Sequence, residues 1–313
     1  MLKIVYVYVG TEKKEYLNML RISVRSAVKH MPDTPIIILT DRQTGDYLQE
    51  SGVFLADAAE ILSVEIPDGY NTVEKSRYLK TNLRELIDGD LLYIDCDVII
   101  CEDISDLSAD TSVSMALDEH GLLSQQDDGG AAIRRAAKAR GLDVDACIKY
   151  FNGGVILAKD DDNAHQFFRR WFEVWDATRK PSMHHDQYSL NAVNLEMDVI
   201  GELDGTYNCQ LTATYRAFSY LRNVKILHYL SAQPDGIYQL NDIEYLRKDF
   251  TDEEIDAIVS DPVKRFLPFH FYADSSVEYR IMQQSHFHLI YRLYTRHRKL
   301  YDFGEKILGK LRK

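Results

Sequence analysis

The run LLYIDCDVII over residues 91–100 carries two carboxylates, Asp95 and Asp97, inside an apolar, β-branched segment. It predicts one buried strand whose alternate side chains share a face, so both aspartates project to the same side. Two adjacent carboxylates repel each other and lose hydration, at a cost of several kcal/mol, roughly, unless something compensates them. A divalent ion such as Mn²⁺ or Mg²⁺ does so and keeps positions open for water or phosphate.

Two other interpretations of this Asp-x-Asp pattern stay open. The strand would end at Ile94, and the aspartates would then only cap a turn. Alternatively, phosphatases of the haloacid dehalogenase type also carry Asp-x-Asp on a strand. Their pair normally lies on the first strand of the domain, whereas Asp95 follows a complete β-α-β unit.

Alternating strands and helices must position this pair. Residues 4–9 and 35–41 are apolar runs typical of buried strands, and residues 16–30 between them have helical spacing of apolar side chains. Further strands are expected at 111–118, 151–159 and 224–230, and helices at 75–86, 163–179 and 186–196. This order predicts an α/β fold with a mostly parallel sheet flanked by helices, in which ligands bind beyond the carboxyl ends of the strands.

Composition narrows the class of protein. The chain has 313 residues, of which 45% are hydrophobic, and a net charge of −12, which argues against a nucleic-acid-binding surface. Four cysteines without a CxxC spacing indicate reduced thiols in a cytoplasmic protein. The N-terminus does not resemble a signal peptide, and no run of ~20 apolar residues is present to span a bilayer.

The tail over residues 286–313 differs from the rest. Apolar residues recur at helical spacing from Ile290 to Leu311, and eight Lys or Arg residues face only Asp302 and Glu305. A basic amphipathic helix of this kind suits an anionic membrane surface. The alternative is a helix packed on its own domain with a solvated basic face.

Five segments of the chain, in order, resemble glycosyltransferase family 8, the family of the glycogenin and lipopolysaccharide galactosyltransferase types. The resemblance covers residues 1–232 and is carried by KSRYLKTNLRELIDGDLLYIDCDVIICEDISDL, FNGGVILAK, HHDQYSLNAV, TYNCQ and ILHYL. It implies a GT-A fold and transfer of a sugar from a nucleotide-diphosphate donor, expected to be a UDP-hexose, with retention of configuration. Asp95, Asp97 and His228 match the residues that bind Mn²⁺ (or Mg²⁺).

The same resemblance implies a set of donor contacts. Val9, Gly10 and Thr11 match the segment that holds the base, and Asp95 also lies near the ribose. Arg77 matches an arginine beside the diphosphate and sugar. Asn152 and Gly153 match contacts to the donor sugar, and Asp118 matches an acidic residue that faces the sugar or the acceptor. The two residues matched to the reacting sugar are the carboxylate Asp186, on the hydroxyls, and Gln187, closest to the anomeric carbon.

Each of these positions also has a simpler interpretation. A lone His228 on a strand would be a satisfied core histidine. The pair Gly153-Gly154 would be a bend at a strand start. Asp186 would cap the helix that it opens, a role compatible with sugar binding.

The sequence departs from the family at three positions. Tyr188 replaces the last Asp of the DQD element, and Ser231 and Pro234 stand where the family has Gly and a phosphate-contacting Lys. Lys75 or a basic residue of the C-terminal part is a candidate replacement. Loss of the lysine also leaves a catalytically inactive nucleotide-sugar-binding protein as an alternative.

The sequence thus predicts three regions: a GT-A catalytic domain over 1–232, a helical acceptor-side region over 233–285 and the basic helix over 286–313. The expected activity is transfer of a hexose from a UDP-sugar to a glycan or glycolipid acceptor in bacterial surface polysaccharide or lipopolysaccharide synthesis. The expected location is the cytoplasm, with peripheral contact to the inner face of the membrane.

Overall fold

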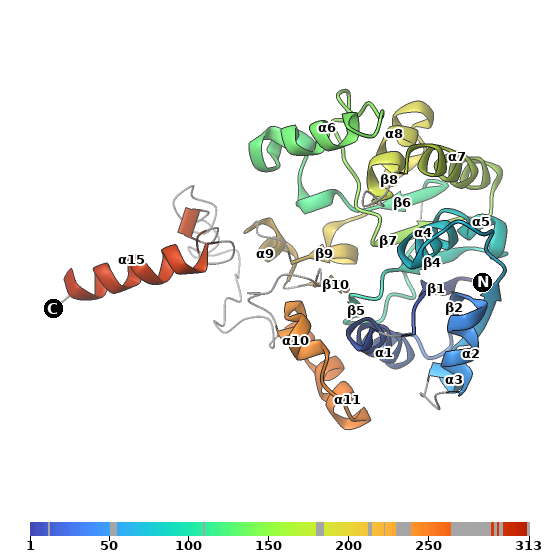
Figure 1. Cartoon of the computed structure of the whole chain (residues 1–313), viewed down its shortest axis with the longest axis horizontal. Coiled ribbons are helices and arrows are strands. Elements are labelled where there is room, and N and C mark those ends of the chain that lie inside the picture. Colours follow the sequence, from blue (N-terminus) through green and yellow to red (C-terminus); the bar gives the residue numbers. More distant parts are fainter. Residues whose placement is uncertain are drawn as a thin grey trace.

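Two β-sheets and their covering helices form the body of the protein in a computed structural model (Figure 1). The structure describes residues 1–11, 13–50, 55–108, 110–179, 185–211, 215–221, 223–229, 239–263, 289–290, 293 and 297–311. The chain opens with the expected β-α-β unit, made of β1 (Lys3–Val7), α1 (Lys14–His30) and β2 (Ile36–Asp41). β1 and β2 pair in parallel.

The larger sheet has the strand order β3-β2-β1-β4-β7-β6-β8. Its other strands are β3 (Glu60–Val64), β4 (Leu91–Ile94), β6 (Val113–Met115), β7 (Val155–Ala158) and β8 (Ile200–Glu202). β7 alone runs antiparallel to its neighbours β4 and β6, whereas every other pair is parallel. The prediction of a mostly parallel sheet is therefore confirmed.

The prediction of one strand over residues 91–100 is wrong. β4 ends at Ile94, and Asp95–Asp97 form a turn that leads into β5 (Val98–Ile100) of a second sheet. This smaller sheet has the order β5-β10-β9 and includes β9 (Cys209–Gln210) and β10 (Ile226–His228). The break falls where the run of apolar side chains gives way to carboxylates, which the dry interior between two layers of helices does not solvate.

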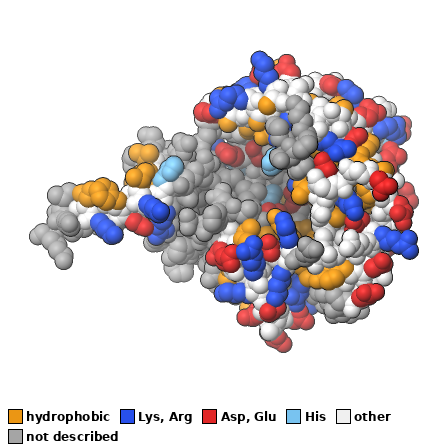
Figure 2. Space-filling view, in the orientation of Figure 1, with side chains coloured by type: hydrophobic (Ala, Val, Ile, Leu, Met, Phe, Trp, Pro, Cys, Tyr) orange, Lys and Arg blue, Asp and Glu red, His pale blue; other side chains and the backbone are white. Residues whose placement is uncertain are grey.

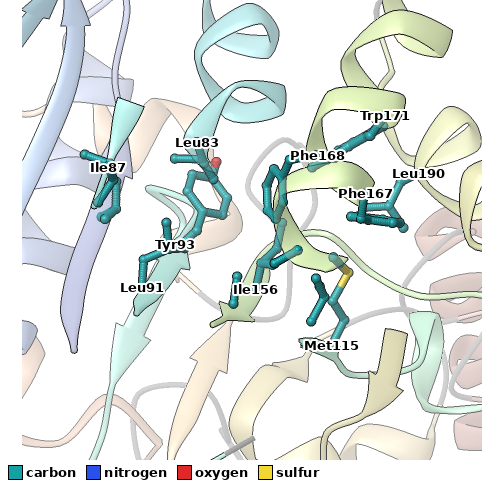
Figure 3. Close-up of a cluster of buried hydrophobic side chains, with 14 of the residues drawn as sticks. Leu83, Ile87, Leu91, Tyr93, Met115, Ile156, Phe167, Phe168, Trp171 and Leu190 are labelled. Atoms are coloured by element: carbon teal, nitrogen blue, oxygen red, sulfur yellow. The ribbon is translucent and has the colours of Figure 1, made fainter. Parts of the chain in front are cut away.

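One face of the larger sheet is covered by helices that present aromatic and branched side chains (Figure 3). These helices are α4 (Thr72–Thr81), α5 (Leu83–Leu86), α7 (Asp162–Thr178) and α8 (Gln187–Met197). Phe167, Phe168 and Trp171 of α7 are fully buried there together with Tyr93 of β4. The helix expected over 75–86 is two helices, because the chain leaves α4 at Asn82, whose side chain donates to the carbonyl oxygen of Tyr78.

The opposite face is covered by α1, α2 (Arg42–Glu50) and α3 (Leu55–Ala58). Alternation along β4 divides its side chains between the two cores: Leu91 and Tyr93 lie in one, Leu92 and Ile94 in the other. The second face of α1 packs against the smaller sheet and against α10 (Ile243–Leu246) and α11 (Asp252–Ser260). Arg25 of α1 pairs with Asp256 of α11 at this contact.

The remaining described helices are α6 (Ala131–Lys138), α9 (Phe218–Leu221) and α15 (Arg298–Leu311). The boundaries predicted at 232/233 and 285/286 lie outside the described residues, so the three-region division stays a prediction. Within the described part of the chain, none of the helices combines the length and the apolar character that a bilayer crossing requires.

Candidate active site

The Asp95–Asp97 turn joins the two sheets and is held by backbone hydrogen bonds on both sides. The amide of Asp95 donates to the carbonyl oxygen of Gly154 over 2.8 Å, and the carbonyl oxygen of Asp97 accepts from the amide of Tyr229 over 3.1 Å. The side chains of Asp95 and Asp97 remain 27% and 19% exposed. The carboxylates therefore sit at the edge of the core with access to a ligand.

His228 completes a group of three candidate metal ligands with Asp95 and Asp97. One ligand atom from each lies within 4.8 Å of the others, and Nε2 of His228 lies 3.4 Å from Oδ1 of Asp97. Two carboxylate oxygens and one imidazole nitrogen form a donor set that suits Mn²⁺, which accepts both ligand types. Burial acts to lower the pKa of His228, but the carboxylates of Asp97 and Asp95 together raise it above its usual value.

Lys80 is a central residue of the site that the sequence interpretation missed. Its Nζ lies 3.2 Å from Oδ1 of Asp95, 3.6 Å from Oδ2 of Asp186 and 4.8 Å above the ring of Tyr93. The side chain is only 4% exposed. The sequence feature that could have indicated Lys80 is the spacing Arg77-x-x-Lys80, which places both cations on one face of a helix.

Arg77 and Lys80 share the carboxylate of Asp186. Nε of Arg77 lies 3.1 Å from Oδ1 of Asp186, so each oxygen of the carboxylate has its own cation. Burial would raise the pKa of Asp186, but Lys80 and Arg77 hold it below its usual value. Asp186 occupies the N-cap position of α8 as expected, but its side chain makes no capping hydrogen bond, so its carboxylate faces the two cations instead.

Asp118 faces the same region from the end of β6. Its Oδ1 accepts from Nδ2 of Asn152 over 2.9 Å, and Gln187 also hydrogen-bonds its carboxylate. Burial raises the pKa of Asp118 despite these bonds. The next two residues, Glu119 and His120, have φ of 51° and 55°. Asp118, Asn152 and Gln187 thus form one hydrogen-bonded group.

The glycine pair does more than bend the chain into β7. A Cβ on Gly154 would lie 2.3 Å from Cε1 of His228, which is closer than real Cβ contacts. A Cβ on Gly153 would meet Leu190 at 3.4 Å and Nζ of Lys80 at 3.7 Å. The absence of side chains at both positions lets β7 approach His228 and Lys80.

The segment Val9–Thr11 follows β1, at the same sheet edge as the carboxylate turn. The amide of Gly10 donates to Oγ1 of Thr44 over 2.9 Å. Lys75 lies on the neighbouring turn of α4, but its Nζ pairs with Asp41 at 2.7 Å. Lys75 is therefore a poorer candidate than Lys80 to replace the missing lysine, because Lys80 contacts Asp95 itself.

The departures Ser231 and Pro234 lie outside the described residues, as does His184 of the HHDQYSLNAV segment. His185 is exposed and packs edge-on against Tyr188. Tyr188, which replaces the family Asp, lies under the guanidinium of Arg140 at 4.4 Å.

Comparisons with known proteins show which families and structures this chain is similar to. The sequence profile of glycosyl transferase family 8 matches residues 7–233. No curated protein sequence matches the chain. Among solved structures, the bifunctional glycosyltransferase WbbM is 15% identical, with a TM-score of 0.52 and coverage of 83% of this chain and 51% of WbbM.

Two further solved structures are similar. The galactosyltransferase LgtC, in complex with donor and acceptor sugar analogs, is 16% identical, with a TM-score of 0.53 and coverage of 81% of this chain and 98% of LgtC. The apo-form glycosyltransferase GlyE of Streptococcus pneumoniae TIGR4 is 17% identical, with a TM-score of 0.50 and coverage of 84% and 64%. The chain therefore spans about half the length of WbbM and nearly all of LgtC.

Replacing Lys80 with Met keeps the aliphatic stem and removes the ammonium from between Asp95 and Asp186. We expect the free energy of unfolding to fall by about 2–3 kcal/mol at neutral pH, since one largely buried carboxylate loses a cation. Because the pKa of Asp186 is depressed in the folded state, this contribution is present above its unfolded pKa and fades below about pH 4. Urea denaturation at several pH values measures it.

The matched control is Lys225→Met, which removes an ammonium from the exposed pair with Glu102. That change is expected to cost less than about 1 kcal/mol. Equal losses in the two variants would contradict the assigned role of Lys80.

Proposed function

The chain belongs to glycosyltransferase family 8, and from that premise we propose that it transfers a hexose from a UDP-sugar to a glycan or glycolipid acceptor, with retention of configuration. The predictions of a family 8 glycosyltransferase and of a GT-A fold are confirmed. The donor, metal, stereochemistry and pathway are part of the proposal. The observation that carries it is the convergence of Asp95, Asp97 and His228 beside the cations Arg77 and Lys80.

The proposed metal is Mn²⁺, or Mg²⁺, held by Asp95, Asp97 and His228. When bound, it would supply positive charge to the diphosphate oxygens of the departing UDP. The residues fit because two carboxylates and an imidazole offer atoms close enough to share one ion.

The protein's own cations would act on the same leaving group. In the reaction, the bond from the anomeric carbon to the β-phosphate oxygen breaks, a bond to the acceptor oxygen forms, and the acceptor proton passes to the departing phosphate. Arg77 and Lys80 lie on one face of α4 and would stabilise the negative charge that develops on that phosphate. We assign to Lys80 the place of the phosphate-contacting lysine that the sequence lacks after His228.

The donor sugar would lie against the carboxylates and amides around β7. Asp186 would accept hydrogen bonds from sugar hydroxyls, and Gln187 would face the anomeric carbon. Asn152 and Gly153 would contact the sugar by side chain and backbone, and Asp118 would orient Asn152 and Gln187 through the hydrogen bonds described above. Val9–Thr11 would hold the uracil.

Calorimetric titration tests the metal-dependent donor site. We expect UDP to bind in the presence of Mn²⁺ and only weakly without it. Asp97→Asn removes one metal ligand and should weaken the Mn²⁺-dependent binding at least about tenfold. Asp103→Asn, which alters an exposed carboxylate shortly after β5, should leave it unchanged. No binding of UDP by the unaltered protein with Mn²⁺ present would rule the donor out.

Turnover separates the enzyme from an inactive binding protein. With Mn²⁺ and a matched UDP-hexose, the protein should release UDP slowly by hydrolysis even without an acceptor, and Asp97→Asn should abolish the release. A panel of UDP- and GDP-sugars, first ranked by thermal shift, provides the donor. Binding without any hydrolysis or transfer would favour the inactive alternative, and hydrolysis of a simple phosphomonoester without nucleotide binding would favour the phosphatase.

The basic helix supplies the argument for a lipid-linked acceptor. Within α15, Leu300, Phe303 and Ile307 are 61%, 63% and 44% exposed, and Lys299 and Lys306 are exposed beside them. Figure 2 shows apolar and basic side chains together on this helix, which Figure 1 draws apart from the sheets. We assign the helix to the inner face of the membrane, the region 1–232 to catalysis and 233–285 to the acceptor.

Vesicle sedimentation tests this assignment. The protein should bind vesicles containing phosphatidylglycerol and bind vesicles of phosphatidylcholine poorly. Replacing Lys299 and Lys306 with Gln should weaken binding about 30-fold, from ~1 kcal/mol per basic residue near the lipid. The double change Lys14→Gln and Lys225→Gln, outside α15, is the control for net charge. Equal binding to both vesicle types would sink the proposal.

A further inference from the structure

A buried series of amide groups connects the backbone of β7 with the ring of His228. The amide of Gly154 donates to Oδ1 of Asn152 over 2.9 Å, and Nδ2 of Asn208 donates to the same oxygen over 3.1 Å. Oδ1 of Asn208 then lies 3.0 Å from Nδ1 of His228. Asn152, Asn208 and His228 are 6%, 0% and 3% exposed, so water has little access to these bonds.

The direction of every hydrogen bond in this series follows from its first member. A backbone N–H only donates, so the atom of Asn152 that faces Gly154 is the oxygen, and its amino group faces Asp118. The oxygen of Asn152 only accepts, so the group of Asn208 that faces it is the amino group. The carbonyl oxygen of Asn208 is left facing His228, and it accepts only from an N–H.

We propose that Asn208 is a positioning residue that keeps a proton on Nδ1 of His228 and thereby presents the bare Nε2 to the metal. This inference rests on the proposed function, in which Nε2 is a metal ligand. With the other neutral tautomer, Nε2–H would point toward Asp97, 3.4 Å away, and no lone pair would be available there. Nδ1 and the oxygen of Asn208 would also face each other as two acceptors.

The surroundings hold both partners in place. Asn208 ends the short 3₁₀ turn Gly205–Asn208, and the next residue enters β9, which pairs with β10 so that Gln210 lies opposite His228. Gly154 packs so closely on the imidazole that any Cβ there would collide with it. A metal-binding histidine usually donates its other ring N–H to an oxygen acceptor that fixes the ring, and the carbonyl oxygen of Asn208 is placed to be that acceptor.

Nitrogen NMR of the metal-free protein tests the inference directly. The two ring nitrogens of a neutral imidazole differ in chemical shift according to which one carries the proton. With ¹⁵N-histidine label, at a pH high enough to keep the ring neutral, we expect His228 to be in the Nδ1–H form. A predominant Nε2–H form in the unaltered protein would overturn the proposal.

Two substitutions and a control provide the link to metal binding. Asn208→Leu removes the acceptor, so it should populate the Nε2–H form and weaken Mn²⁺ binding by roughly 10- to 100-fold in calorimetry. Asn208→Asp keeps an acceptor and should retain the Nδ1–H form, which keeps the test decisive if the Leu variant does not fold. Asn18→Leu removes an equally buried amide, bonded to the carbonyl oxygens of Leu246 and Lys248, and should change neither measurement.

The outcomes separate this inference from the proposed function. Absence of Mn²⁺ binding in the unaltered protein would refute the proposed metal site, whereas the tautomer would still be decided by NMR. Unchanged Mn²⁺ affinity and an unchanged Nδ1–H signal in Asn208→Leu would refute the role of Asn208 alone.

Discussion

The burial of carboxylates at the junction of two sheets is the constraint on which this structure depends. Asp95 and Asp97 follow β4 and are only partly exposed, and Asp186, at the start of α8, is nearly buried, so water solvates these carboxylates incompletely. Each has a partner from another element: Lys80 for Asp95, His228 for Asp97 and Arg77 for Asp186. Unpaired charges at these depths would cost several kcal/mol each, roughly, so the elements that carry the partners have to meet here.

The architecture around this junction follows from that requirement. α4 covers the sheet with its apolar side chains and turns Arg77 and Lys80 toward the end of β4. Its start is fixed by a capping box in which Asn71 and Glu74 bond each other's backbone amides. β7 runs antiparallel beside β4, and the glycines that precede it lie against His228 (Gly154) and Lys80 (Gly153). The same elements that build the core thus set the positions of the charged groups.

The site also has a polar layer behind its charged groups. Asn152 and Asn208 are almost fully buried, and together they connect Asp118, the backbone of β7 and His228. Because a buried amide left without partners is unfavourable, these bonds favour a single arrangement of the side chains. A prearranged set of metal ligands and two cations held in place match the needs of the proposed reaction, in which charge develops on a departing diphosphate.

Much of this was accessible from the sequence by itself. The β-α-β start, the mostly parallel sheet and the family followed from periodicity and from short motifs in a fixed order, because these patterns are local or depend only on order along the chain. The sequence also indicates Asp95, Asp97 and His228 as one set of metal ligands through their match to the family, and the three side chains lie together in the structure.

The tertiary structure alone decided the rest. It split residues 91–100 between two sheets, since the pairing partners of β5 lie more than a hundred residues away. In the structure the carboxylate of Asp186 contacts two cations and makes no capping hydrogen bond. Lys80 rather than Lys75 faces Asp95, because the rotation of α4 about its axis determines which lysine points toward it. A sequence states which charges exist, whereas only the packing of distant elements determines which of them are buried together.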